Sequence, residues 1–373
     1  MHDEPDNQGD HHGRSRFAGR SVLIVDQGLA KHRRGKPIHG VELFRLYLVG
    51  RMLERGVRVT LVCERSWSKA FDEHGLTGHP LLTPVLVPNI GGVVVNALVG
   101  AVRTLAEEHD AILIGNPRKG LVPAMYALTL AQPDARTLVF AHRRGEHRFL
   151  DMVQGIDFDL VCVSEEVARK YRGNVSGSID VMYGLPNHAE FYPPAAPPGD
   201  DGIVRCCLLG RLPNVSKGTD KALRALELLD PGVRGRVELH LASYIEEPPD
   251  RVSSVPGVVC HRWLRPADVP PFLRTMDAML TLSSNETFSQ AIVQGMLTGL
   301  PIVATRIPVY EEKLDTGGGL LAHTPEHIAR AITTLVEDPA GRARMGGIAR
   351  ETALERYCWD TDAFLERHLF PER

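Results

Sequence analysis

Short apolar runs alternate with longer amphipathic stretches from residue 21 onward. This alternation is typical of the strand–helix units that build a parallel β-sheet. In the first half of the chain, strands are predicted at 22–25, 57–63, 111–115, 137–141 and 160–163, and helices at 41–55, 93–108, 121–130 and 165–171. We expect this half to form one doubly wound α/β domain.

A proline-rich segment at 186–202 interrupts the alternation. It holds four prolines within 193–198 and two consecutive aspartates, Asp200 and Asp201. This composition resists both helix and strand and is typical of a linker, which we place at 193–202.

The alternation resumes after the linker. Strands are predicted at 204–209, 237–242, 258–260, 277–282 and 302–304, and helices at 219–229, 289–298 and 325–335. Two doubly wound, Rossmann-like domains facing a cleft are therefore expected. Ligands of such sheets bind beyond the carboxyl ends of the strands.

Length and composition agree with two globular domains. A chain of 373 residues exceeds what one hydrophobic core usually supports, and 43% hydrophobic with 24% charged residues is ordinary for soluble proteins. The net charge of -3 offers no general attraction to nucleic acid or to anionic membranes, so neither is expected as a partner. Residues 1–20 lack an apolar core, so we expect a disordered tail and not a secretory signal or a membrane span.

Six cysteines are scattered without the paired spacing of a metal site. They are Cys63, Cys162, Cys206, Cys207, Cys260 and Cys358. Most lie in apolar runs, which favours buried, reduced thiols in a cytoplasmic protein.

Two cations follow the first predicted strand of the second domain. Arg211 and Lys217 lie six residues apart across a turn, and together they could grip a diphosphate. A solvated turn is the alternative. No strand is followed by the glycine pattern of a nicotinamide dinucleotide site, and the phosphate-binding loop of nucleotide hydrolases is missing as well.

A polar segment at 283–290 lies between a predicted strand and a predicted helix. It places the Glu286 carboxylate in front of free helix amides, which can bind an anion such as phosphate. Glu286 would then accept hydrogen bonds from sugar hydroxyls. Alternatively, Glu286 or Ser284 merely caps the helix.

Together these segments resemble the retaining glycosyltransferases of family 4, which have the GT-B fold. The motifs stand in the family's order: HGVE (39–42), YGLP (183–186), GRL (210–212), KG (217–218), the segment 286–294, GLPIVAT (299–305) and YCWD (357–360). The resemblance implies an acceptor-side domain at 21–192, a nucleotide-sugar-binding domain at 203–350, and a C-terminal helix at 351–373 that crosses back to the first domain.

The resemblance also implies site residues. Catalytic roles are implied for His142, Arg211, Lys217 and Glu286. Donor contacts are implied for Gly40, Gly210, Thr287, Phe288, Ser289 and Gln294. The implied reaction is retaining, metal-independent transfer of a hexosyl group from a nucleotide diphosphate sugar, which is a substrate, so no cofactor is expected. A secondary-metabolite or glycan pathway would use such an enzyme.

Three positions depart from the family pattern. Gln294 replaces the second glutamate of the Glu-x7-Glu motif, His39 replaces the first glycine of its loop, and Tyr183 stands where asparagine is common. These departures leave the donor's sugar and base open. Two other functions stay open: a nucleotide-sugar epimerase, since that class can share the GT-B architecture, and a catalytically silent sugar-binding protein, which the departures at Gln294 and His39 suggest.

Two basic segments follow strands of the first domain. In one interpretation, Arg33 and Arg34 in the first segment, and Arg143 and Arg144 in the second, contact a small, anionic acceptor. A solvated basic loop is the alternative. Stable membrane insertion is not expected. Membrane-lipid acceptors are disfavoured as well, because the resemblance associates them with an amphipathic helix of basic and aromatic residues that this sequence lacks.

Overall fold

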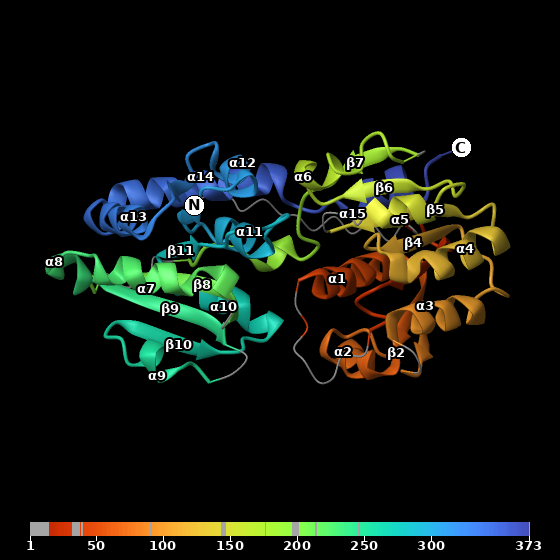
Figure 1. The fold of residues 1–373 in the computed structure, drawn as a ribbon, viewed down its shortest axis with the longest axis horizontal. Coiled ribbons are helices and arrows are strands. Elements are labelled where there is room, and N and C mark those ends of the chain that lie inside the picture. The colour runs from red at the N-terminus through yellow and green to blue at the C-terminus, as the bar shows by residue number, and fades with distance from the viewer. Residues whose placement is uncertain are drawn as a thin grey trace, which may run out of the picture.

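The computed structural model describes residues 15–31, 38, 40–89, 92–142, 147–175, 177–195, 201–212, 215–244 and 247–372. The chain forms two lobes, each built around its own parallel sheet (Figure 1). The C-terminus lies on the N-terminal lobe, because the chain crosses between the lobes twice.

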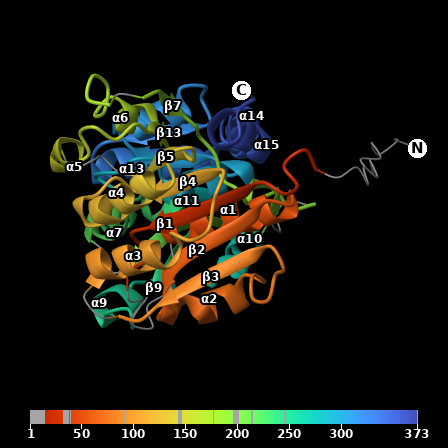
Figure 2. The ribbon, with the colours of Figure 1, turned by 90° about the vertical axis from the view of Figure 1, so that its right-hand side faces the viewer.

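In the described part of the chain, seven parallel strands form the N-terminal sheet in the order β3-β2-β1-β4-β5-β6-β7. The strands are β1 (Ser21–Asp26), β2 (Arg58–Glu64), β3 (Leu82–Val87), β4 (Ala111–Gly115), β5 (Arg136–Ala141), β6 (Asp159–Cys162) and β7 (Ile179–Val181). The helices are α1 (Val41–Glu54), α2 (Ser68–Glu73), α3 (Gly92–Arg103), α4 (Val122–Ala131), α5 (His147–Met152) and α6 (Glu165–Ala168). Helices cover both faces of this sheet, with α1 on one side and α3 and α4 on the other (Figure 2).

Six strands form the second sheet within the described residues, in the order β10-β9-β8-β11-β12-β13. The strands are β8 (Val204–Leu212), β9 (Val237–Tyr244), β10 (Val258–Arg262), β11 (Ala278–Thr281), β12 (Ile302–Thr305) and β13 (Gly319–Ala322). The helices are α7 (Thr219–Glu227), α8 (Pro231–Arg234), α9 (Asp250–Ser253), α10 (Val269–Leu273), α11 (Gln290–Leu297), α12 (Pro308–Leu314), α13 (Pro325–Glu337) and α14 (Pro339–Arg356).

These two sheets confirm the predicted α/β class with two Rossmann-like domains. The strand order reverses between β1 and β4 in the first sheet and between β8 and β11 in the second. Such reversals leave a crevice beyond the carboxyl ends of the flanking strands, where ligands bind.

The strands that the sequence pattern did not predict lie at sheet edges. β3 and β7 are the outer strands of the first sheet, and β13 is an outer strand of the second. Most of their residues are partly exposed, so they lack the continuous apolar run of a strand buried on both faces.

The two crossings between the lobes lie side by side. The Leu185 amide donates to the Tyr357 carbonyl at 3.1 Å, and Leu185 pairs with Cys358 in an isolated parallel bridge. Beyond this point, α15 (Thr361–Phe364) and a short π-helix (Leu365–Leu369) pack against the N-terminal lobe. Trp359 contributes to that packing edge-to-face on Phe44, with ring centroids 5.2 Å apart.

No helix in the described segments combines the length and apolar character that crossing a bilayer requires.

Candidate active site

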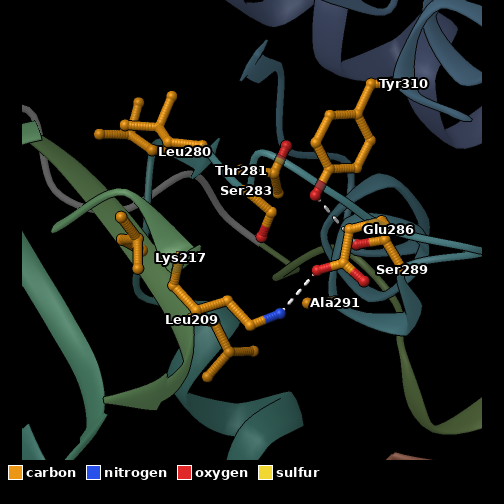
Figure 3. A pocket seen from close by; sticks show the side chains of 11 residues that line it. Leu209, Lys217, Leu280, Thr281, Ser283, Glu286, Ser289, Ala291 and Tyr310 are labelled. Atoms are coloured by element: carbon orange, nitrogen blue, oxygen red, sulfur yellow. Dashed lines mark hydrogen bonds and ion pairs between the residues drawn. The ribbon is translucent and has the colours of Figure 1, made fainter. Parts of the chain in front are cut away.

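A pocket opens at the strand-order reversal of the C-terminal sheet, beyond the ends of β8 and β11 (Figure 3). Its walls combine aliphatic side chains with hydroxyls and one ion pair. The lining residues are Leu208, Leu209, Lys217, Leu280, Thr281, Leu282, Ser283, Glu286, Ser289, Ala291 and Tyr310.

The ion pair joins two of the residues that the sequence singled out. Lys217 Nζ lies 2.6 Å from Glu286 Oε1, and both side chains are mostly buried, at 29% and 18% exposure (Figure 3). Glu286 thus keeps the ammonium group inside the pocket. An anionic ligand could pair with the Lys217 ammonium group in place of Glu286. The Glu286 carboxylate would then be able to accept hydrogen bonds from hydroxyls.

Gly218 sets the position of Lys217. It has a left-handed φ of 80°, and a Cβ there would lie 2.5 Å from the Leu282 carbonyl oxygen. Only glycine permits both this conformation and this close approach. The turn that carries Lys217 therefore packs directly against the end of β11.

The N-terminus of α11 opens into the same pocket. The N-cap position is occupied by Ser289 and not by Glu286 or Ser284, and the Ser289 side chain makes no capping hydrogen bond. Ser289 has a left-handed φ of 62°, which is uncommon for a residue other than glycine. Its hydroxyl lies 3.5 Å from the Tyr310 hydroxyl, and burial raises the pKa of Tyr310, which keeps that group neutral.

We call residues 286–289 the donor loop; it contacts the N-terminal lobe directly. The Thr287 hydroxyl donates to the backbone carbonyl of His142 at 2.9 Å. His142 follows β5, is 5% exposed, and packs its ring against Phe44 and Phe140, with centroids 4.7 and 4.6 Å away. Its backbone amide donates to the Asn116 side chain at 3.2 Å, so the end of β4 holds the end of β5.

Gly40 begins α1 on the opposite side of this contact. It has a left-handed φ of 62° and a ψ of -122°, a backbone conformation that favours glycine. A Cβ at this position would have no heavy atom within 4 Å, so a side chain would not clash with its surroundings. The Gln290 side chain donates to the Gly40 carbonyl at 3.4 Å. The N-termini of α1 and α11 therefore approach one another, and each carries a positive partial charge.

A buried carboxylate at the end of β1 anchors the loop that leads to α1. Asp26 is fully buried and accepts from the Gly28 amide at 2.7 Å and from Arg45 Nε at 3.4 Å. A Cβ on Gly115 would lie 1.8 Å from the Asp26 carboxylate, so glycine makes room for it. In the sequence, Asp26 is recognisable as an acidic residue that directly follows the apolar run 22–25.

Part of the sequence is similar to known proteins. Residues 204–338 match the family model described as glycosyl transferases group 1. D-inositol 3-phosphate glycosyltransferase of Corynebacterium glutamicum (strain R) is 30% identical over 101 residues, 26% of this chain and 24% of that protein. Its Streptomyces avermitilis counterpart is 32% identical over 95 residues, 25% of this chain and 20% of that protein. The chain thus aligns with a quarter or less of these relatives' length.

Similarity over almost the whole chain is found in solved structures. HepE of Anabaena, in complex with UDP, matches with a TM-score of 0.70 at 18% identity, covering 93% of this chain and 98% of that one. WaaG, a glycosyltransferase involved in lipopolysaccharide biosynthesis, matches with a TM-score of 0.62 at 13% identity, covering 93% and 98%. The chain has the GT-B fold. Its C-terminal GT-B domain also carries the sequence pattern of the group 1 glycosyl transferases.

The GT-B cleft brings together part of the expected site. Glu286, Lys217 and Ser289 line the pocket, while Thr287 joins His142 at the domain contact. Gly210 lies in β8, where a Cβ would be 3.4 Å from the Lys217 side chain.

Other expected residues lie elsewhere in the GT-B fold or outside the described residues. Phe288 is buried against Tyr183 and Tyr357, and Gln294 is half-buried on α11 without lining the pocket. Only the backbone of Arg211 is described, in β8. Arg33, Arg34, Arg143 and Arg144 lie outside the described residues.

Sequence reasoning missed Tyr310 and the hydroxyls of Thr281 and Ser283 in the pocket. Nothing in the local sequence around Tyr310 distinguishes it from an ordinary core tyrosine. Among the described residues, no three His, Cys, Asp or Glu side chains lie close enough together to hold a metal ion.

Proposed function

We propose that this protein is a retaining glycosyltransferase that moves a sugar from a nucleotide diphosphate sugar to a small, anionic acceptor. One observation carries the proposal: the N-terminus of α11 opens into the pocket that holds the ammonium group of Lys217, and the Gln290 side chain at that helix end contacts Gly40 at the N-terminus of α1. A positive helix end and a cation in one pocket, with a second positive helix end in contact with the first, favour a bound anion with more than one charge. A diphosphate that bridges the two domains meets that requirement.

The same groups would stabilise the transition state. As the sugar leaves, negative charge develops on the diphosphate, and preorganised cations and amides lower the energy of that charge. We assign this role to Lys217, to Arg211 and to the α11 amides, and no metal is needed for it. Glu286 would accept hydrogen bonds from hydroxyls of the donor sugar, and His142 would contact the transferred sugar. Attack on the same face would then retain the anomeric configuration.

The donor contacts beyond this centre also remain proposals. Gly40 and Gly210 would allow backbone approach to the diphosphate, because glycine has no side chain to obstruct it. Gln294 would bind the ribose hydroxyls through its single amide oxygen. HepE structures contain UDP and UDP-glucose, which makes uridine the first base to test.

A nucleotide panel tests donor binding. We expect one of the uridine, guanosine, adenosine and thymidine diphosphates to raise the melting temperature, because a ligand at about a hundred times its Kd adds roughly 2.7 kcal/mol of stability. The matching nucleotide sugar should then be consumed only when an acceptor is present, and NMR of the product should show retained configuration. An epimerised sugar formed from donor alone would contradict transfer, and no shift with any nucleotide would contradict the donor site.

Names among the relatives support an anionic acceptor. The D-inositol 3-phosphate glycosyltransferases act, by name, on a phosphorylated polyol. We propose that Arg33, Arg34, Arg143 and Arg144 hold such an acceptor.

All six cysteines are free thiols, which supports the proposal that the protein works in the reducing cytoplasm.

Salt dependence tests the acceptor. With D-inositol 3-phosphate as the probe, added salt should raise the acceptor KM steeply and the donor KM less, since screening weakens exposed charge pairs most. Replacing Arg143 and Arg144 with Gln should raise the acceptor KM and spare acceptor-independent donor hydrolysis. Unchanged acceptor kinetics in that variant would identify both basic segments as solvated loops.

A further inference from the structure

Lys313 is a buried cation that the proposed reaction does not use. It lies on α12, one turn beyond the pocket residue Tyr310, and its side chain is fully buried. Among the described residues, its Nζ has no hydrogen-bond partner. A buried ammonium group is costly unless something replaces water around it.

Three aromatic rings surround this ammonium group. Lys313 Nζ lies 4.6 Å from the ring centroid of Phe288, 4.7 Å from that of Tyr357 and 5.9 Å from that of Tyr183. The rings also contact one another, with centroids 5.8 to 6.4 Å apart. The faces of aromatic rings attract cations, most strongly where water is excluded. We call these three rings and Lys313 the aromatic cage.

The cage joins segments that are far apart in the sequence. Tyr183 precedes the first crossing between the lobes, and Tyr357 begins the second. Phe288 belongs to the donor loop, whose other members contact Lys217, His142 and Tyr310. Whatever fixes Phe288 therefore also restricts the backbone of Glu286, Thr287 and Ser289.

We propose that Lys313 is a positioning residue of the donor site, whose ammonium group binds the three rings and thereby holds the donor loop against both crossings between the lobes. The role of the loop in donor binding rests on the proposed function, whereas the cage itself does not. A neutral amine would lose the attraction to the rings, and the loop would become more mobile.

The charge state of Lys313 is close to changing at physiological pH. Burial lowers the pKa of Lys313 to about 8, and the neighbouring Glu312 carboxylate opposes that shift. Burial raises the pKa of Tyr183 to about 12 and raises that of Tyr357 as well, so both rings stay neutral near pH 8. Among the described residues, the charged groups that act on Tyr183 and Tyr357 include Glu312 of α12, Asp315 at the C-cap of that helix, Arg356 of α14 and Glu165 of α6.

Stability should depend on pH in a direction that follows from this shift. The pKa of Lys313 is lower in the folded protein than the ordinary value of 10.5, so the unfolded chain binds more protons between about pH 8 and 10.5. The contribution of Lys313 to the free energy of unfolding of the wild type therefore increases as pH rises from about 8 to 10.5. Lys313→Met should have a higher melting temperature than wild type at pH 7, and the difference should shrink toward pH 10.

Hydrogen exchange of peptides covering 284–289 tests the positioning role without any ligand. The local opening that exposes these amides moves the Phe288 ring away from an ammonium group that stays buried, whereas global unfolding exposes that group to water, so the two have opposite pH dependence. In wild type, protection corrected for intrinsic exchange should therefore fall about tenfold between pH 7 and 9.5, as Lys313 loses its proton. Lys313→Met should show, at both pH values, the low protection of wild type at pH 9.5. Lys313→Arg stays charged and should show, at both pH values, the high protection of wild type at pH 7. Lys221→Met, a partly exposed lysine of α7, is the matched control and should behave as wild type.

Binding of UDP in the same four proteins separates the two proposals. Affinity should follow donor-loop protection, weakening about tenfold in wild type from pH 7 to 9.5 and remaining weak in Lys313→Met. If no nucleotide binds but protection behaves as described, the proposed function fails and the cage stands. If Lys313→Met keeps wild-type protection and its pH dependence, Lys313 does not position the loop, even where UDP binds.

Discussion

Lys217→Met should lower turnover by about a hundredfold to a thousandfold while the protein stays folded, as expected when one preorganised charge-stabilising group is removed. Lys217 is the cation of the pocket whose side chain the structure describes, and it is paired with Glu286 at 2.6 Å. Its removal leaves the carboxylate to repel the diphosphate. Turnover of the nucleotide sugar identified by the panel measures the effect, and circular dichroism verifies the fold.

Two further variants sharpen this test. Lys221→Met removes a lysine from α7 that does not line the pocket and should retain wild-type turnover. Lys217→Met combined with Glu286→Gln should recover part of the lost nucleotide affinity, because the unpaired carboxylate is gone. Wild-type turnover in Lys217→Met would rule out a role for this ammonium group in the reaction.

Gly184→Ala should cost roughly 3 kcal/mol of stability, because it combines backbone strain with a clash that cannot relax. Gly184 has a φ of 125°, and a Cβ there would lie 2.7 Å from the Trp359 amide nitrogen and 2.9 Å from the Cys358 carbonyl carbon. Both contacts are backbone atoms of the second crossing, so no side chain can rotate away. The melting temperature measures the loss.

Gly347→Ala is the matched control for this substitution. Gly347 lies in α14 with no heavy atom within 4 Å of a built Cβ. Alanine favours a helix over glycine by about 1 kcal/mol, so this variant should melt at or above the wild-type temperature. Equal melting temperatures for Gly184→Ala and wild type would show that the two crossings are not held as tightly as the structure indicates.

The apolar pattern was sufficient for the α/β class because central parallel strands are buried on both faces. β1, β4 and β5 read as continuous apolar runs and were predicted to within one or two residues. The proline-rich segment and the second set of runs likewise indicated two domains. The edge strands β3, β7 and β13 escaped, because a partly exposed strand has no such run.

Part of the candidate site was also readable from local sequence. Glu286 before a helix, and Lys217 after a strand, are signals of position along the chain, and the structure places both in one pocket. Their mutual contact was not readable, since the two residues are 69 positions apart. Local periodicity determines which face of an element is buried but carries no information about which distant element covers that face.

The contacts between the lobes were decided by tertiary structure alone. Thr287 meets His142 across 145 positions, and Gln290 meets Gly40 across 250. Lys313 reads in the sequence as an ordinary charged helix residue, yet the two crossings and the donor loop enclose it with three rings. The sequence by itself determined the two sheets and the polar segments at their ends, because these depend on neighbouring residues. Tertiary packing determined the ion pair, the facing helix ends and the buried lysine, because each requires segments that only the folded chain brings together.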